Sequence, residues 1–151
     1  MPKIRKAVTS DIKGIHQLIN SFAKKGLMLP RSLNELYEHV RDIYLAEENG
    51  DLLGVCSLHL LWEDLAEIRS LLVVDKAREK NLGKRLINKC IQEARKLGVK
   101  RIFALTYIPE YFQKNGFVEI DKSVLPQKIW GDCLKCHKFP ECDEFAVIRE
   151  I

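Results

Sequence analysis

Hydrophobic positions recur along this chain with a period near 3.6 in three places, which predicts three main helices. The first helix has its apolar face at positions 12, 15, 18, 19 and 22, and Thr9 or Ser10 is placed to cap it. The second begins with the capping box SLNE at residues 32–35. Its apolar face is expected to hold Leu33, Leu36, Tyr37 and Val40. The third is apolar along one face from 82 to 97 and ends at Gly98, a residue suited to the left-handed position after a helix.

The segments between these helices predict strands. Residues 3–8 suit a short first strand, and residues 43–62 suit two strands around a turn at Asn49 and Gly50, a strong hairpin signal. Residues 65–74 predict a third antiparallel partner. Residues 99–105 follow it through a helical crossover, so these two strands should be parallel. Residues 109–117 predict a short helix stopped by Asn115 and Gly116, with another strand beginning at Val118.

This order of elements predicts an α/β (α+β) fold: a mixed, mostly antiparallel sheet with a central parallel strand pair, flanked by helices on both faces. The 151 residues, 46% of them hydrophobic, suit a single domain over residues 1–151. The net charge of +4 arises from 25 basic residues scattered among 21 acidic ones, so neither nucleic acid nor a membrane is indicated as a partner. The N-terminal residues show no signal-peptide pattern, and a cytoplasmic location is therefore expected.

The segment AREKNLGKRL, at residues 77–86, places a glycine and four cations where the third helix begins. A helix N-terminus offers unpaired N–H groups and the positive end of the helix dipole, which suits an anion such as phosphate. Residues 71–105 resemble the coenzyme A binding core of the GNAT N-acetyltransferases, whose loop pattern is Gln/Arg-x-x-Gly-x-Gly/Ala. Arg78, Asn81 and Gly83 occupy its fixed positions, and Asn replaces the first glycine. Asn tolerates the left-handed backbone better than most residues do. The segment YFQKNGF, at residues 111–117, resembles the family's second signature.

This resemblance implies acetyl-CoA as co-substrate and a cofactor core at about residues 65–117. In the family, loop amides hold the pyrophosphate, and the strand before the loop splays from its parallel neighbour to admit the pantetheine arm. Carried over, these roles fall on Leu72, Val73, Val74, Arg78, Glu79, Lys80, Asn81, Leu82, Gly83 and Lys84. For Glu79 and Leu82 only the backbone N–H is involved. The alternative is an ordinary helix start with solvated lysines.

Acetyl transfer to an amine also requires a proton acceptor, because a free amine is mostly protonated at neutral pH. Glu67 matches the position of the glutamate that many family members use as general base, directly or through water. The alternative is a surface glutamate at a strand end. Many relatives return a proton to the departing thiolate from a tyrosine in the helix before Gly-Phe, where this chain has Phe112. Tyr111 and Tyr107 are the neighbouring candidates, and each could instead serve packing.

A narrower resemblance concerns the acceptor. The segments GLMLPRSLNEL, PEYFQKNGF and LPQKIWGDCLKCHKFPECDEFAV resemble the acetyltransferase portion of bacterial N-acetylglutamate synthases, especially the short stand-alone kind. This implies acetylation of the α-amino group of an amino acid, glutamate, as the first step of arginine biosynthesis. Arg31, with Ser32 nearby, and Lys128 would then face the substrate carboxylates. Arg69, on the same strand face as Glu67, could help. Without the resemblance, Arg31 and Lys128 are ordinary surface cations.

Five cysteines and no export signal indicate reduced thiols, with Cys56 and Cys90 in the core. A cysteine-containing insertion at about residues 121–144 carries Cys133, Cys136, His137 and Cys142, a set that zinc accepts. Adjacent Cys136 and His137 are hard to direct at one ion, so no bound metal is expected there. The alternative interpretations of these cysteines are a redox or disulfide role and a purely structural role in packing.

Two further functions stay open at this point. The first is acetylation of another small amine or of a protein N-terminus by the same fold. The second is a metal-binding or nucleic-acid interaction module, without enzymatic activity, built on the cysteine cluster and the basic loop. Arg31 and Lys128 favour an anionic acceptor over a cationic one. Whether the chain forms a homodimer is also left open.

Overall fold

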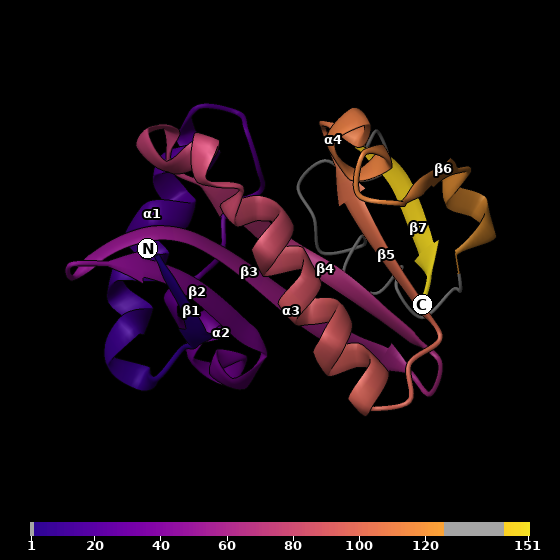
Figure 1. The fold of residues 1–151 in the computed structure, drawn as a ribbon, viewed down its shortest axis with the longest axis horizontal. Coiled ribbons are helices and arrows are strands. Elements are labelled where there is room, and N and C mark those ends of the chain that lie inside the picture. Colours follow the sequence, from indigo (N-terminus) through magenta and orange to yellow (C-terminus); the bar gives the residue numbers. More distant parts are fainter. Residues whose placement is uncertain (1, 126–143) are drawn as a thin grey trace.

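One twisted sheet organises the computed structural model, which describes residues 2–125 and 144–151 (Figure 1). The seven strands lie in the order β1-β2-β3-β4-β5-β7-β6, and every neighbouring pair is antiparallel except β4–β5, which is parallel. The strands are β1 (Lys3–Lys6), β2 (Ile43–Glu48), β3 (Asp51–Trp62), β4 (Leu65–Val73), β5 (Arg101–Thr106), β6 (Val118–Ile120) and β7 (Phe145–Glu150). The predicted fold class, with its central parallel pair, is therefore confirmed.

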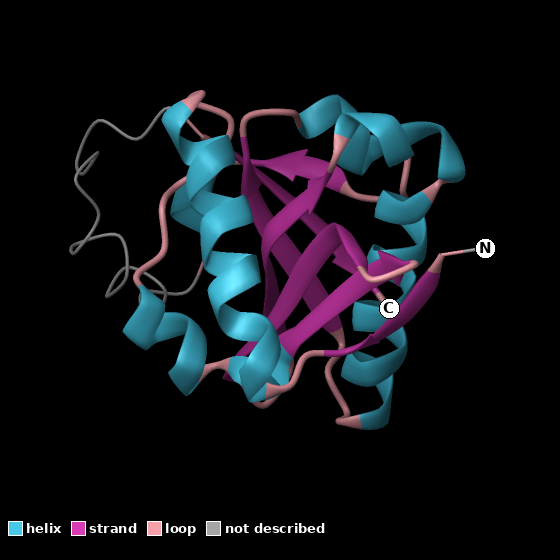
Figure 2. Ribbon diagram, turned by 90° about the vertical axis from the view of Figure 1, so that its left-hand side faces the viewer, coloured by secondary structure: helices cyan, strands magenta, loops and turns pink. Residues whose placement is uncertain are grey.

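Helices cover both faces of this sheet (Figure 2). The α-helices are α1 (Ile12–Lys24), α2 (Leu33–Glu38), α3 (Leu82–Lys96) and α4 (Pro109–Gln113). Short 3₁₀ turns occur at η1 (Thr9–Asp11), η2 (Val40–Asp42), η3 (Asp75–Lys80) and η4 (Lys122–Val124). Side chains of α1 and α2 share one buried cluster with β2 and β3, whereas α3 and α4 pack in a second cluster on the opposite face. Burial of two apolar faces thus explains why the sheet is covered on both sides.

Local sequence signals account for most element boundaries. Asn49 and Gly50 have φ values of 53° and 82°, the backbone that a two-residue hairpin with the correct twist requires. The side chain of Ser32 accepts a hydrogen bond of 3.1 Å from the Glu35 amide and so caps α2, as predicted. Gly98 follows α3 with φ 88°, as expected for the residue after a helix.

Two expectations fail, and one strand was not foreseen. Thr9 and Ser10 do not cap α1 but lie in η1, and it is Asp11 that accepts the Val8 amide at 2.7 Å. The predicted apolar face of the second helix is also only partly correct: Leu36 is buried, but Tyr37 is 38% exposed, and Val40 lies in η2 because α2 already ends at Glu38. Strand β7, which pairs with both β5 and β6, was not predicted from the sequence.

The feature that creates the site is the separation of β4 from β5. The two strands pair from Leu65 to Ile68 on β4 and from Arg101 to Ala104 on β5, and they then diverge toward their carboxyl ends (Figure 1). Ser70 has φ 56°, and the register of β4 against β3 shifts beside it. A bulge of this kind bends a strand and changes which side chains face each side. In the described part of the chain, the β5-facing edge of residues 70–73 is therefore not paired with β5.

The remaining fold-level expectations concern the thiols and the helices. Cys56 and Cys90 are both buried and their sulfur atoms lie 3.6 Å apart, so the core assignment is confirmed. Among the helices of the described residues, none is long and apolar enough to cross a membrane.

Candidate active site

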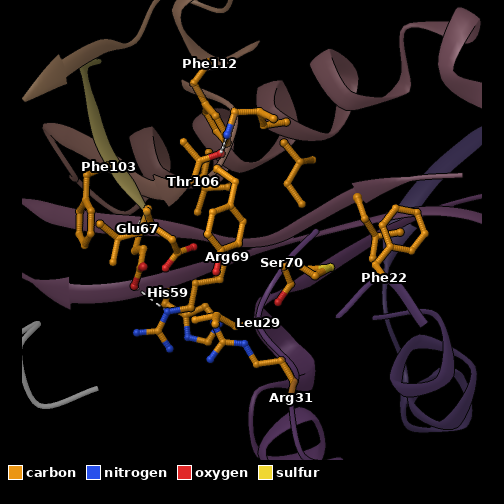
Figure 3. Close-up of a pocket in the computed structure, with 18 of the residues that line it drawn as sticks. Phe22, Leu29, Arg31, His59, Glu67, Arg69, Ser70, Phe103, Thr106 and Phe112 are labelled. Atoms are coloured by element: carbon orange, nitrogen blue, oxygen red, sulfur yellow. Dashed lines mark hydrogen bonds and ion pairs between the residues drawn. The ribbon is translucent and has the colours of Figure 1, made fainter. Parts of the chain in front are cut away.

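A cavity of about 1160 Å³ lies where β4 and β5 separate (Figure 3). The described residues that line it come from the loop after α1, from β3 and β4, from the end of β5 and from the starts of α3 and α4. Its lining includes Arg31, His39 and His59 together with Arg78, Asn81 and Gly83. The sheet opening thus connects the residues predicted for the acceptor with those predicted for the cofactor.

Glu67 and Arg69 form a buried ion pair in the middle of this cavity. Both residues line it, and Arg69 Nε donates a 2.6 Å hydrogen bond to Glu67 Oε1 (Figure 3). Glu67 is only 7% exposed, so the alternative of a surface glutamate at a strand end is wrong. The two residues lie on one face of β4, as the alternation of a strand predicts. A guanidinium bonded through Nε holds this carboxylate in one orientation.

His59 lies beside Glu67 on the neighbouring strand, and the sequence did not predict it as a site residue. The two residues are partners in the register of β3 and β4, and both face the cavity. Burial, together with the positive charges of Arg69, His39 and Arg31, lowers the pKa of His59 to about 2. The imidazole is therefore neutral at physiological pH. A single histidine in an apolar strand gives no sequence signal for such a position.

Arg31 is brought to the cavity by a contact that the sequence did not reveal. Asn20 of α1 donates a 3.0 Å hydrogen bond to the Arg31 carbonyl and accepts one of 3.3 Å from the Arg31 amide. Arg31 Nη1 donates to Glu35 Oε2 at 3.1 Å. Within the described residues, its other guanidinium N–H groups make no hydrogen bond. The Ser32 hydroxyl instead accepts the hydrogen bond that caps α2. Ser32 is not among the described residues that line the cavity.

The cofactor end is the start of α3. Asn81 adopts the left-handed backbone, with φ 59° and ψ 29°, as its place in the family pattern predicts. Of the ten residues predicted for the cofactor, five line the cavity: Leu72, Val73, Arg78, Asn81 and Gly83. The other five are Val74, Glu79, Lys80, Leu82 and Lys84. The Lys80 side chain points elsewhere, because its Nζ donates to Glu48 Oε1 at 3.0 Å, and Leu82 is buried in the core.

The two tyrosines differ in their surroundings, although both line the cavity. The Tyr111 hydroxyl lies against Gly83, at the point where any side chain on residue 83 would project. Burial, with a contribution from Cys56, raises the pKa of Tyr111, so its phenol stays protonated at neutral pH. The Phe112 side chain is buried and packs edge-on against Phe117. Lys128 and the cluster of Cys133, Cys136, His137 and Cys142 lie outside the described residues.

The fold and this cavity define an acetyltransferase. Residues 13–117 match the sequence profile of the acetyltransferase (GNAT) family, and the chain belongs to that family. It is a GNAT N-acetyltransferase, and proteins similar to it include amino-acid acetyltransferases.

Individual relatives support this assignment. The amino-acid acetyltransferase of Mycobacterium tuberculosis is 33% identical over 139 residues, which are 90% of this chain and 79% of that protein. An uncharacterised N-acetyltransferase of Chlorobaculum tepidum, CT2212, is 36% identical over 98% of this chain and 96% of that protein. Among solved structures, the N-acetylglutamate synthase of Neisseria gonorrhoeae with coenzyme A and N-acetyl-glutamate has a TM-score of 0.89 at 29% identity. That match covers 99% of this chain and 35% of the gonococcal chain, so the present chain corresponds to about a third of it. The M. tuberculosis protein Rv2747, in complex with CoA, has a TM-score of 0.84 at 27% identity, with 99% of both chains covered.

Proposed function

We propose that the chain transfers the acetyl group of acetyl-CoA to the α-amino group of glutamate, the first step of arginine biosynthesis. The observation that carries this proposal is that Arg31 and Arg69 line the same cavity as Asn81 and Gly83 at the start of α3. Two guanidinium groups there suit an acceptor with carboxylates and disfavour a polyamine or another cationic amine. The likeness to a synthase solved with coenzyme A and N-acetyl-glutamate supports the same acceptor.

At the cofactor end, the proposal assigns the pyrophosphate of acetyl-CoA to the amides at the start of α3. The first N–H groups of a helix have no partner within it, and the dipole adds positive charge there. The left-handed Asn81 turns the chain so that α3 begins directly after η3. The β5-facing edge of residues 70–73, which is not paired with β5, offers backbone groups to the amides of the pantetheine arm. Arg78 lines the cavity and adds a positive charge beside the phosphates.

Glu67 is proposed as the proton acceptor. The acceptor amine is mostly an ammonium at neutral pH and must lose one proton before it can attack the thioester carbonyl carbon. The nitrogen loses a second proton once the carbon–nitrogen bond has formed, and this balances the proton that the departing thiolate gains. A buried carboxylate held by Arg69 is positioned to receive a proton from the nitrogen, directly or through one water. As the carbon–sulfur bond breaks, the departing thiolate takes a proton, and Tyr111 is the proposed donor. Its phenol keeps that proton at neutral pH, which suits a donor. Tyr107 also lines the cavity and is the second candidate.

The experiment that tests the acceptor is an acetylation panel with acetyl-CoA and purified protein. Glutamate is expected to be the preferred acceptor over aspartate, glutamine, lysine, arginine and spermidine. Arg31→Ala should raise the Michaelis constant for glutamate by about ten- to a hundredfold and leave that for acetyl-CoA unchanged, because one charge-assisted contact contributes roughly 1.5–3 kcal/mol. Arg41→Ala, which removes an exposed cation of η2, is the matched control. Preference for a cationic amine, or equal effects of Arg31→Ala on both substrates, would overturn the proposal.

A further inference from the structure

A cluster of three metal-ligating side chains lies at the wall of the cavity and has no role in the proposed reaction. It consists of His39 after α2, Asp42 of η2 and His59 of β3, and one ligand atom of each lies within 4.8 Å of the other two. His39 Nδ1 lies 3.1 Å from Asp42 Oδ2, and His59 Nδ1 lies 4.0 Å from the same oxygen. The two imidazole rings have their centroids 4.7 Å apart. Both histidines line the cavity.

We propose that His39, Asp42 and His59 form a binding site for a divalent transition-metal cation of the zinc class. Two imidazoles and one carboxylate are a ligand set that zinc uses where it has three protein ligands and keeps a fourth position for water or another ligand. Zinc bonds of about 2.0–2.2 Å in tetrahedral directions hold the ligand atoms roughly 3.4 Å apart. The separation of His39 and Asp42 already fits this value, and that of His59 and Asp42 exceeds it by about 0.6 Å.

Two of the three ligands are free enough to close the gap between His59 Nδ1 and Asp42 Oδ2. The His59 side chain is 9% exposed and is fixed by its place in a central strand, whereas those of His39 and Asp42 are 41% and 34% exposed. Rotation of the two exposed side chains toward a fixed imidazole therefore completes the site without movement of the sheet. The ligands also come from two separate segments of the chain, which is why the sequence did not indicate them.

The neighbouring charges allow a cation here. Arg31 and Arg69 are near enough to disfavour positive charge on His59, and they would also repel a metal ion. Each of the two guanidinium groups, however, is paired with a carboxylate: Arg31 with Glu35 at 3.1 Å and Arg69 with Glu67 at 2.6 Å. Asp42 supplies the negative charge in direct contact with the ion. None of the three ligands belongs to the cysteine-containing segment, for which no metal was expected from the sequence.

Cobalt and zinc titrations test the proposal and distinguish it from a site made by Cys133, Cys136 and Cys142. Calorimetry of the whole chain should detect one zinc equivalent at the cluster. Cobalt bound there should give d–d absorption without the sulfur-to-metal charge-transfer band that thiolate ligands produce. His39→Ala and Asp42→Asn should each weaken zinc binding by at least tenfold. His16→Ala, which removes a histidine of α1 outside the cluster, should bind zinc as the unaltered chain does.

Several results would overturn the proposal. These are the absence of zinc binding, unchanged zinc affinity in both cluster variants, or a cobalt spectrum that shows only thiolate ligation. Because His39 and Asp42 are partly exposed, both variants are expected to fold. Unchanged circular dichroism and melting temperature in the absence of metal verify this.

Discussion

At the scale of single residues, the environment of Glu67 decides what that side chain can do. It lies inside the cavity, 7% exposed, with its carboxylate oriented by Arg69 and with His59 across the sheet. A strand-end glutamate on the surface would have none of these constraints. Glu67 is thus placed for chemistry by Arg69 on its own strand and His59 on the neighbouring one, although only its position in the family pattern pointed to it in the sequence.

Glu67→Gln should lower kcat by on the order of a hundredfold or more at neutral pH, with little change in acetyl-CoA affinity, because glutamine keeps the shape but cannot accept a proton. The rate should recover partially as the pH approaches the pKa of the acceptor amine, since solvent can then remove the proton. Steady-state kinetics across pH measure both effects. Glu63→Gln, an exposed carboxylate in the β3–β4 turn, is the matched control. Rates near those of the unaltered chain at every pH would exclude Glu67 as the base.

At the scale of elements, one arginine ties the first strand to the first helix. Arg5 of β1 donates to both oxygens of Asp11, at 2.8 and 2.9 Å, and to Glu47 of β2 at 2.7 Å. The same Asp11 carboxylate accepts the Val8 amide. These bonds explain why Asp11, and neither Thr9 nor Ser10, organises the start of α1. Asp11 joins two elements and caps a turn at the same time.

Asp11→Asn is expected to destabilise the fold by about 1–2 kcal/mol at neutral pH. Its hydrogen bond from Arg5, followed by that from the Val8 amide, lowers the pKa of Asp11 in the folded chain. A carboxyl with a depressed folded pKa contributes stability above its unfolded value, near 3.9, and loses it as the pH falls through the folded value. Denaturant unfolding should therefore show a difference between the two chains that shrinks below about pH 4. Asp51→Asn, at an exposed carboxylate, should show almost none. A difference that is independent of pH would contradict this account.

At the scale of the whole molecule, the sheet is two parts joined by the short parallel pairing of β4 and β5. Beyond Ile68 and Ala104 the strands diverge, and the cavity occupies the opening. A ligand bound between them contacts both parts of the sheet. Ligand binding and global stability are therefore coupled in this fold.

Coenzyme A at a hundredfold excess over its dissociation constant should stabilise the chain by about 2.7 kcal/mol, which raises the melting temperature by roughly 5–10 °C at this size. Gly83→Val should abolish that shift, because a side chain at residue 83 would meet the Tyr111 hydroxyl and block the start of α3. Gly14→Ala, at a helical glycine with open space around it, should keep the shift. Restoration of the shift in Gly83→Val combined with Tyr111→Ala would mean that displacement of Tyr111, rather than the blocked helix start, causes the loss.

The sequence by itself determined the element types, the hairpin, the parallel pair and the loop at the start of α3. These depend on local properties: the period of apolar residues, the left-handed tolerance of Asn and Gly, and the capping of a helix by a nearby hydroxyl. Glu67 and Arg69 could be placed on one strand face for the same reason. All of these features except the parallel pair are encoded within a few neighbouring residues, and the parallel pair follows from the order of the elements along the chain.

Only the tertiary structure decided how distant segments meet. Four features join residues whose order in the chain gives no hint of contact. They are the burial of Glu67, the pairing of β7 with β5 and β6, the hydrogen bonds between Asn20 and Arg31, and the cluster of His39, Asp42 and His59. The bulge at Ser70 and the separation of β4 from β5 open the cavity, and the packing of the helices and loops around it sets which side chains line it. A local pattern specifies the conformation of a segment, whereas the groups that surround a side chain depend on how all segments pack together.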